Sequence, residues 1–103
     1  MIIVQGTFTV DPSTRDEYLA QSVEQMRISR AEKGCQEYAL AADPVQPDRV
    51  ILSERWDSAD DLNEHVKALT LRREEAAAQG DTAGLAPLSR EIARYEVTSA
   101  QAM

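Results

Sequence analysis

Cysteine is almost absent from this sequence: the chain of 103 residues has one, Cys35, so no disulfide can form within it. A single cysteine favours a reducing compartment, and we predict a cytoplasmic protein. The sequence has no run of about 20 apolar residues and no basic start followed by an apolar segment. We therefore expect neither a membrane span nor a signal peptide.

Basic residues are also few, 11 against 18 acidic residues, which leaves a net charge of −7. That charge repels phosphate backbones and anionic lipids, so we expect neither nucleic acid nor a membrane as a partner. Potential metal ligands are sparse too, because the only histidine, His65, lies thirty residues from Cys35. No glycine-rich nucleotide-binding motif is present. We therefore expect no metal and no nucleotide cofactor.

What the chain does contain is an alternation of strand-like and helix-like segments. β-branched, aromatic and alternating apolar residues predict strands at 2–10, 35–42, 49–56 and 90–97. Helical spacing of apolar residues predicts helices at 12–33 and from 58 to about 80, with a loop at 80–87. The order β-α-β-β-α-β is that of the ferredoxin-like α+β fold, a four-stranded antiparallel sheet with helices on one face.

Capping residues mark where the two helices begin. Thr14 and Glu17 have the spacing of a capping box at the start of the first helix. Ser58 can cap the second helix, with Asp61 three residues later in the favourable first turn.

A small domain of this kind leaves one face of its sheet without helices. We assign residues 1–98 to a single domain and 99–103 to a C-terminal tail. The predicted strands carry apolar residues on both faces, and a domain of this size gains stability when such a face is covered. We therefore predict a homodimer.

Two runs of residues carry a family resemblance. The first reads G-C-x-x-Y-x-L from Gly34 to Leu40, and the second reads E-x-W-x-S-x-x-x-L-x-x-H from Glu54 to His65. Over residues 2–97 the chain resembles the antibiotic biosynthesis monooxygenase family of the dimeric α+β barrel superfamily. The resemblance implies a homodimer in which two sheets form a barrel and each subunit has a pocket between sheet and helices. Similar proteins include cofactor-independent oxygenases of quinols and polycyclic phenols, haem-degrading enzymes and isomerases.

His65 is the first candidate for a catalytic residue. It follows Trp56 by nine residues, on the helix after that strand, and can reach the same pocket. Imidazole titrates near neutral pH, which suits abstraction of a proton from a phenol or an activated CH group. The alternative is a histidine between helix and sheet that is hydrogen-bonded to the backbone.

Aromatic residues supply the candidates for substrate binding. Trp56 can stack on a planar ring, or it can be a core tryptophan. Gly6 and Phe8 lie on the apolar face of the first strand, where Gly6 would leave room for a pocket. The hydroxyls of Tyr38 and Tyr18 can bond to a ligand oxygen, although both tyrosines can equally be packing residues. Tyr38 ranks first as a catalytic hydrogen-bond donor, because it belongs to the family motif.

Charged residues near the motif have more ordinary expected roles. We expect Glu54 to pair with Arg55, Arg49 or a base of a partner subunit. Arg72 and Arg73 could hold an anionic substrate at the pocket mouth. We favour a solvated pair that faces the glutamates at 74 and 75.

The function favoured by the resemblance is a cofactor-independent monooxygenase that oxidises a small aromatic or quinol-type substrate with O₂. The alternatives are an isomerase or tautomerase that uses the same base, and a non-catalytic dimeric module that binds small molecules. Haem-degrading relatives use a first-strand asparagine and a helical histidine that ligates iron. Here Gly6 and Thr7 stand near the asparagine position and no histidine follows His65, so we expect no haem.

Overall fold

The computed structural model describes residues 1–80 and 84–103, so the middle of the expected loop, residues 81–83, lies outside the described residues. Strands and helices follow one another in the predicted order. Their bounds are β1 (Ile2–Thr9), a short 3-10 helix (Pro12–Thr14), α1 (Arg15–Gln21), α2 (Val23–Arg30), β2 (Cys35–Ala42), β3 (Arg49–Trp56), α3 (Ala59–Ala78) and β4 (Ser89–Glu96).

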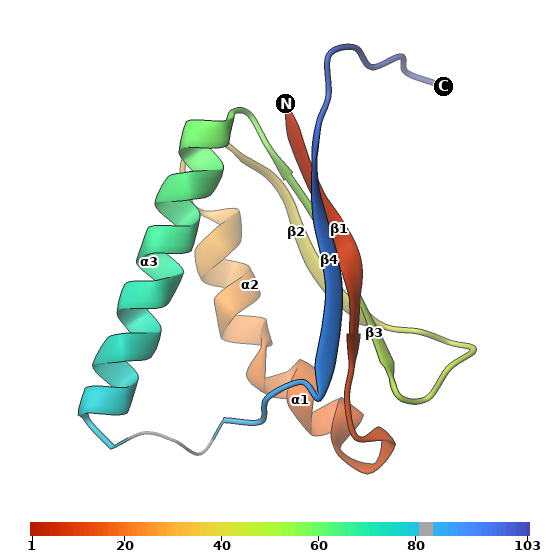
Figure 1. Ribbon diagram of the computed structural model, residues 1–103, viewed down its shortest axis with the longest axis vertical. Coiled ribbons are helices and arrows are strands. Elements are labelled where there is room, and N and C mark those ends of the chain that lie inside the picture. The colour runs from red at the N-terminus through yellow and green to blue at the C-terminus, as the bar shows by residue number, and fades with distance from the viewer. Residues whose placement is uncertain (81–83) are drawn as a thin grey trace.

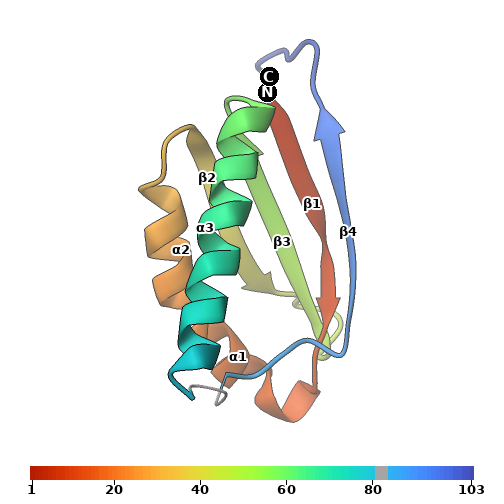
Figure 2. The ribbon, with the colours of Figure 1, turned by 60° about the vertical axis from the view of Figure 1, so that its left-hand side comes forward.

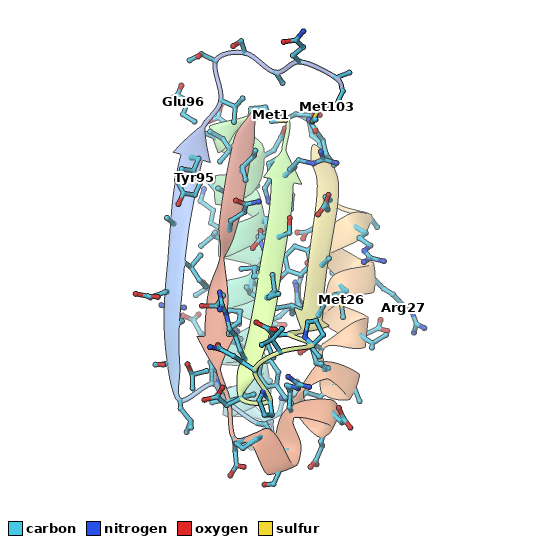
Figure 3. All side chains as sticks on the ribbon, turned by 90° about the vertical axis from the view of Figure 1, so that its right-hand side faces the viewer. Met1, Met26, Arg27, Tyr95, Glu96 and Met103 are labelled. Carbon is cyan, nitrogen blue, oxygen red and sulfur yellow. The ribbon has the colours of Figure 1, made fainter. Side chains whose placement is uncertain are left out.

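In the described part of the chain the strands form one antiparallel sheet, which Figure 1 shows nearly edge-on. The strand order is β2-β3-β1-β4 (Figure 2). The helices α2 and α3 lie side by side on one face of this sheet, as Figure 2 shows. The opposite face carries no helix (Figure 3). The predicted ferredoxin-like α+β fold is therefore confirmed. No helix among the described residues is long and apolar enough to cross a membrane.

The first predicted helix is interrupted. In place of one helix at 12–33, α1 ends at Gln21 and α2 begins at Val23. Between them the hydroxyl of Ser22 donates a 2.8 Å hydrogen bond to the carbonyl of Tyr18, a side-chain contact that competes with regular helix bonding. The helix also ends earlier than predicted, because α2 stops at Arg30 with Ala31 as its C-cap. Gly34 has the predicted left-handed conformation, with φ of 79°, but it lies in the turn before β2.

One predicted cap is wrong and the other is confirmed. The Thr14 side chain makes no capping hydrogen bond, so the expected capping box is not formed. Asp11 caps the chain one turn earlier, since its carboxylate accepts from the Ser13 amide at 2.9 Å. At α3 the Ser58 hydroxyl accepts from the Asp61 amide at 3.1 Å, as predicted.

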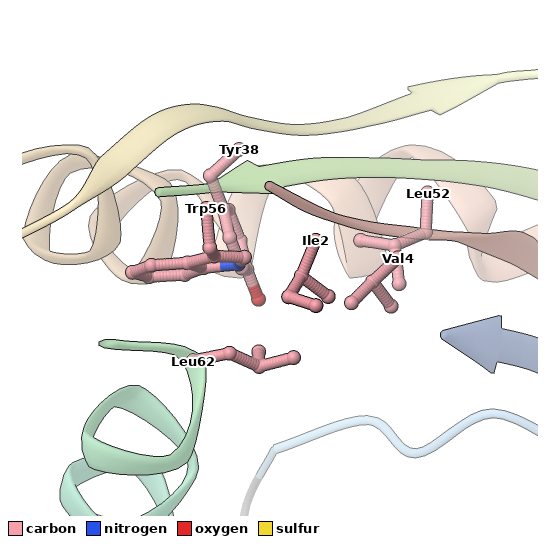
Figure 4. Packing of buried hydrophobic residues seen from close by; sticks show 6 residues of the cluster. All are labelled: Ile2, Val4, Tyr38, Leu52, Trp56 and Leu62. Atoms are coloured by element: carbon pink, nitrogen blue, oxygen red, sulfur yellow. The ribbon is translucent and has the colours of Figure 1, made fainter. Parts of the chain in front are cut away.

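The core lies between the helices and the inward face of the sheet. Alternate residues of β1 and β3 point to this side, as the period of two in the sequence predicts. They pack with Tyr38 of β2 and Leu62 of α3 (Figure 4), and the buried cluster consists of Ile2, Val4, Tyr38, Leu52, Trp56 and Leu62. β4 is exposed along its whole length, so it forms one wall of an open layer rather than part of the packed core.

Candidate active site

A cleft of about 1160 Å³ separates the inward face of the sheet from α2 and α3. Its walls combine apolar side chains with a few ionisable ones. The lining includes Val4, Phe8, Tyr18, Gln25, Tyr38, Leu52, Glu54, His65, Leu69, Arg72, Arg73, Arg90, Ile92 and Arg94. An apolar cleft with a small number of polar groups is typical of a small-molecule site.

His65 is held in this cleft by a carboxylate. Its Nδ1 lies 2.7 Å from Oε1 of Glu32, a residue between α2 and β2. An ionised carboxylate only accepts hydrogen bonds, so this contact favours the tautomer of the neutral ring in which Nδ1 carries the proton and Nε2 keeps its lone pair. The expected hydrogen bond to the backbone is therefore wrong, whereas the expected burial of this histidine between helix and sheet is observed.

Glu54 lies on the other side of the imidazole. Its Oε1 accepts a 3.0 Å hydrogen bond from Nε1 of Trp56 and lies 3.9 Å from Nε2 of His65. The expected pairing of Glu54 with an arginine is wrong, because Arg55 pairs with Glu37 at 3.2 Å. Burial raises the pKa of Glu54, an effect that the hydrogen bond from the indole opposes.

Arg49, the second arginine considered for Glu54, is also engaged elsewhere. Its Nε lies 3.6 Å from a carboxylate oxygen of Asp43, at the far end of the sheet from His65. Glu54 faces inward because side chains alternate along β3, which places Glu54 on the same face as Leu52 and Trp56.

Trp56 packs behind the histidine rather than along the cleft. The indole is fully buried, and its ring centre lies 4.6 Å from that of His65. Trp56 does not line the cleft in this chain, so the expected stacking of a substrate on the indole is not available. Its contacts instead fix the positions of the His65 ring and the Glu54 carboxylate.

Tyr38 does line the cleft, with its ring centre 5.4 Å from that of His65. The hydroxyl points away from β2 into the layer between sheet and α3 (Figure 4). Burial, assisted by the charge of Glu54, raises the pKa of Tyr38 to about 12. The hydroxyl therefore stays protonated at neutral pH, which suits a hydrogen-bond donor.

The remaining expected binding residues divide into two groups. Phe8 and Tyr18 line the cleft, with ring centres 6.5 Å apart, and burial raises the pKa of Tyr18. Gly6 does not line it. A Cβ at this position would meet the backbone of β4, 2.6 Å from the Cα of Ile92, so the missing side chain makes room for a neighbouring strand. The expectation that Gly6 opens the pocket is wrong.

Sequence reasoning also misjudged the two arginines of α3. Both Arg72 and Arg73 line the cleft, and a guanidinium nitrogen of Arg72 donates to Oε1 of Gln25 at 3.1 Å. Among the described residues, neither forms an ion pair with Glu74 or Glu75, so the expected pairing with these glutamates is wrong, whereas Arg73 is exposed, as expected of a solvated side chain. Their spacing from Leu69, three and four residues earlier, places them on its side of α3 and was the available signal.

The described residues, 1–80 and 84–103, contain no group of three histidine, cysteine or acidic side chains that could hold a metal ion. The expected absence of a bound metal remains a prediction.

Solved structures with the same fold come from several bacteria. A proposed antibiotic biosynthesis monooxygenase from Deinococcus radiodurans is 21% identical, with 100% of this chain and 98% of that chain covered and a TM-score of 0.72. A similarly described protein from Nitrosomonas europaea is 16% identical, with 96% and 100% covered and a TM-score of 0.74. A protein of unknown function from Bacteroides thetaiotaomicron, described as a possible oxidoreductase, is 19% identical, with 93% and 96% covered and a TM-score of 0.72. At these identities the likeness shows the fold.

No protein among the curated sequences matches the chain. The family model described as antibiotic biosynthesis monooxygenase matches residues 1–77, which include α2, β2, β3 and nearly all of α3. The matched residues carry both motifs of the sequence, the cleft residues Glu54 and His65, and the Glu32 carboxylate that contacts the imidazole. The chain therefore belongs to the antibiotic biosynthesis monooxygenase family.

Proposed function

We propose that the cleft is the active site of an oxygenase that oxidises a small phenolic or quinol-type aromatic substrate directly with O₂. The observation that carries this proposal is the 2.7 Å contact between Nδ1 of His65 and Glu32, which leaves Nε2 as a proton acceptor in a mostly apolar cleft. Family membership supports a monooxygenase-like activity in general.

The reaction begins with removal of a proton. Nε2 of His65 takes the proton from a phenol or from an activated CH₂ group of the substrate, and Glu32 stabilises the resulting imidazolium. The Tyr38 hydroxyl, which keeps its own proton, donates a hydrogen bond to the oxygen on which the negative charge develops. Apolar walls such as Leu52 and Phe8 exclude water from the anion.

The substrate anion then supplies the electrons. It transfers one electron to O₂, and the substrate radical and superoxide combine at carbon to form a peroxide, which takes a proton from His65. Loss of the remaining proton on that carbon breaks the O–O bond, one oxygen stays as a carbonyl and the other leaves as water. For a CH₂ substrate the balance is R₂CH₂ + O₂ → R₂C=O + H₂O. The substrate is the reductant for both oxygen atoms.

A second candidate is an isomerase that uses the same groups without O₂. A 1,3 proton shift needs one group that removes a proton and another that returns one. The buried Glu54 carboxyl, whose pKa is raised by burial, lies 3.9 Å from Nε2 of His65 and could serve as that second group. A module that binds small molecules without reaction is the third possibility.

Oxygen uptake with a panel of anthrones and naphthohydroquinones separates these functions. We expect enzyme-dependent O₂ consumption with the stoichiometry above, lost in His65→Gln and kept in Lys67→Gln, a change at an exposed position of the same helix. Solvent deuterium incorporation into recovered substrate without O₂ uptake would favour the isomerase. Saturable binding with neither result would favour the binding module, and either outcome would contradict the oxygenase.

We propose in addition that the protein is a homodimer built on the open face of the sheet. Apolar side chains on this face include Ile51 and Tyr95, which are 40% and 53% exposed. In the sheet register Ile3 pairs with Tyr95 and Thr7 with Ile51, which places these side chains on the face opposite the helices. A second copy of the chain would cover them.

A further inference from the structure

We propose that the substrate of this cleft carries an anionic group, a carboxylate or a phosphate, which binds to arginines at the mouth of the cleft between α3 and β4. This inference rests on the proposed function, because it defines the substrate class of the same site. The charge around the cleft is opposite in sign to that of the chain as a whole.

The chain has a net charge of −7, yet positive groups predominate in the cleft. Its described lining contains four arginines and two carboxylates. One of the carboxylates, Glu24, pairs with Arg27 outside the cleft at 3.6 Å. The other, Glu54, is buried and bonded to the indole of Trp56. The open part of the cleft is therefore cationic.

The four arginines come from two facing elements. Arg72 and Arg73 are neighbours on α3, and Arg90 and Arg94 lie on β4. In the register of the sheet Arg90 pairs with Phe8 and Arg94 with Val4, both of which line the cleft, so the two β4 arginines share that face. Figure 2 shows β4 at one edge of the sheet and α3 in front of the same sheet.

The charges of these arginines are not neutralised within the described chain. Arg72 donates to the neutral amide of Gln25, and Arg94 donates at 3.3 Å to the neutral Oδ1 of Asn63. Among the described residues, no carboxylate forms an ion pair with any of the four. These neutral partners orient the guanidinium groups and leave their charge available to a ligand.

Arg73 lies within electrostatic range of two hydroxyls of the cleft. Its positive charge opposes the effect of burial on the pKa of both Tyr38 and Tyr18, so its guanidinium lies near the two hydroxyls. A guanidinium binds a carboxylate or a phosphate through two parallel hydrogen bonds, which a single hydroxyl group of a neutral substrate cannot form. The arrangement thus fits a planar ring near His65 with an anionic substituent directed toward Arg73.

Isothermal titration calorimetry with three naphthalene probes tests this inference. The probes are 1-hydroxy-2-naphthoate, 1-naphthyl phosphate and 1-naphthol, which share a ring and differ in charge at neutral pH. We expect at least one anionic probe to bind about tenfold or more tightly than 1-naphthol, as for a charge-assisted contact. Preference for the carboxylate or for the phosphate identifies which anion the site takes.

Two variants and one control locate the binding site. Arg73→Gln and Arg90→Gln should each weaken the favoured anionic probe about tenfold and leave 1-naphthol unchanged. Lys67→Gln removes the same charge from an exposed position of α3 outside the cleft and should have no effect beyond weak long-range screening. Circular dichroism confirms that each variant is folded.

Equal binding of all three probes would overturn the inference, and so would equal losses in Arg73→Gln and Lys67→Gln. These results are independent of the oxygen-uptake experiment. An anionic probe that binds through Arg73 in a protein that consumes no O₂ would contradict the proposed reaction and support the anionic ligand. O₂ uptake with neutral quinols alone would support the reaction and contradict the anionic substrate.

Discussion

The imidazole of His65 and the carboxylate of Glu32 are 33 residues apart in the chain, and their Nδ1 and Oε1 atoms are 2.7 Å apart in the fold. This contact joins α3 to the turn that follows α2, and the Trp56 ring packs against the same imidazole. It determines which nitrogen carries the proton of the neutral ring. A histidine held in one tautomer at the wall of an apolar cleft is the arrangement that the proposed proton transfer requires.

Replacement of His65 by alanine should lower turnover about 10²–10⁴-fold, the usual contribution of a general base. The measurement is kcat by oxygen uptake with the best substrate of the panel. Lys67→Ala, an exposed change two residues later on α3, is the control and should keep full activity. Unchanged turnover in a folded His65→Ala protein would show that the histidine is structural and would move the catalytic assignment to Tyr38.

Glu32→Gln tests the positioning role of the carboxylate. The amide can still bond to the imidazole, but it can present either its oxygen or its NH₂ group, so the tautomer is no longer fixed. We expect kcat to fall about tenfold with little change in KM, in line with the loss of an outer contact that orients a catalytic group. NMR of ¹⁵N-labelled imidazole should show a protonated Nδ1 in the wild type and mixed tautomers in the variant. Identical spectra in the two proteins would contradict the role.

Glu54 should make the stability of the protein dependent on pH. Burial raises its pKa in the folded state above 4.5, so its contribution to stability is fully present below pH 4.5 and is lost as the pH rises through the folded-state pKa. Glu54→Gln keeps an acceptor for the Trp56 indole and removes the charge. Urea unfolding should therefore show the variant gaining stability relative to the wild type between acidic and neutral pH. The opposite trend would mean that His65 stabilises an ionised Glu54.

Tyr38 should affect stability at the other end of the pH scale. Its folded-state pKa of about 12 lies above the ordinary value of 10.0, so its contribution is fully present below pH 10 and is lost as the pH rises toward 12. A shift of this size corresponds to roughly 2–3 kcal/mol across that range. Tyr38→Phe should flatten the alkaline decline of the unfolding free energy, whereas Tyr95→Phe, at an exposed position, should not. Equal declines in all three proteins would contradict the assignment.

Much of the fold follows from local sequence patterns. The bounds of β2 and β3 match the predicted ranges, and α3 begins after the predicted Ser58 cap, because alternation and capping are local signals. The break at Ser22 could not be predicted in this way. Apolar residues keep their helical spacing across it, and only the folded backbone shows the Ser22 hydroxyl bonded to Tyr18.

The site was less predictable, since it depends on contacts between distant segments. The family motif led to His65 and Tyr38, and both line the cleft. It said nothing of Glu32, which no spacing connects to the histidine. Trp56 and Gly6 were assigned to the pocket on the correct face of their strands, but packing of neighbouring elements decided which atoms reach the cleft. The alternation of residues along a strand predicts which face of the sheet a side chain lies on, but it does not predict how deeply that side chain is buried.

The homodimer can be tested at Ile51, which lies on the inner strand β3 of the open sheet face, between Thr7 of β1 and Ala41 of β2. Ile51→Glu would place a charge in the proposed interface, where desolvation without a partner opposes association. We expect sedimentation under reducing conditions to show a dimer for the wild type and a shift toward the 11.4 kDa monomer for the variant. Leu71→Glu, at a 56% exposed position on α3 away from the sheet, is the matched control and should remain dimeric. A monomeric wild type at micromolar concentration would contradict the dimer, and dimers of both variants would place the interface elsewhere.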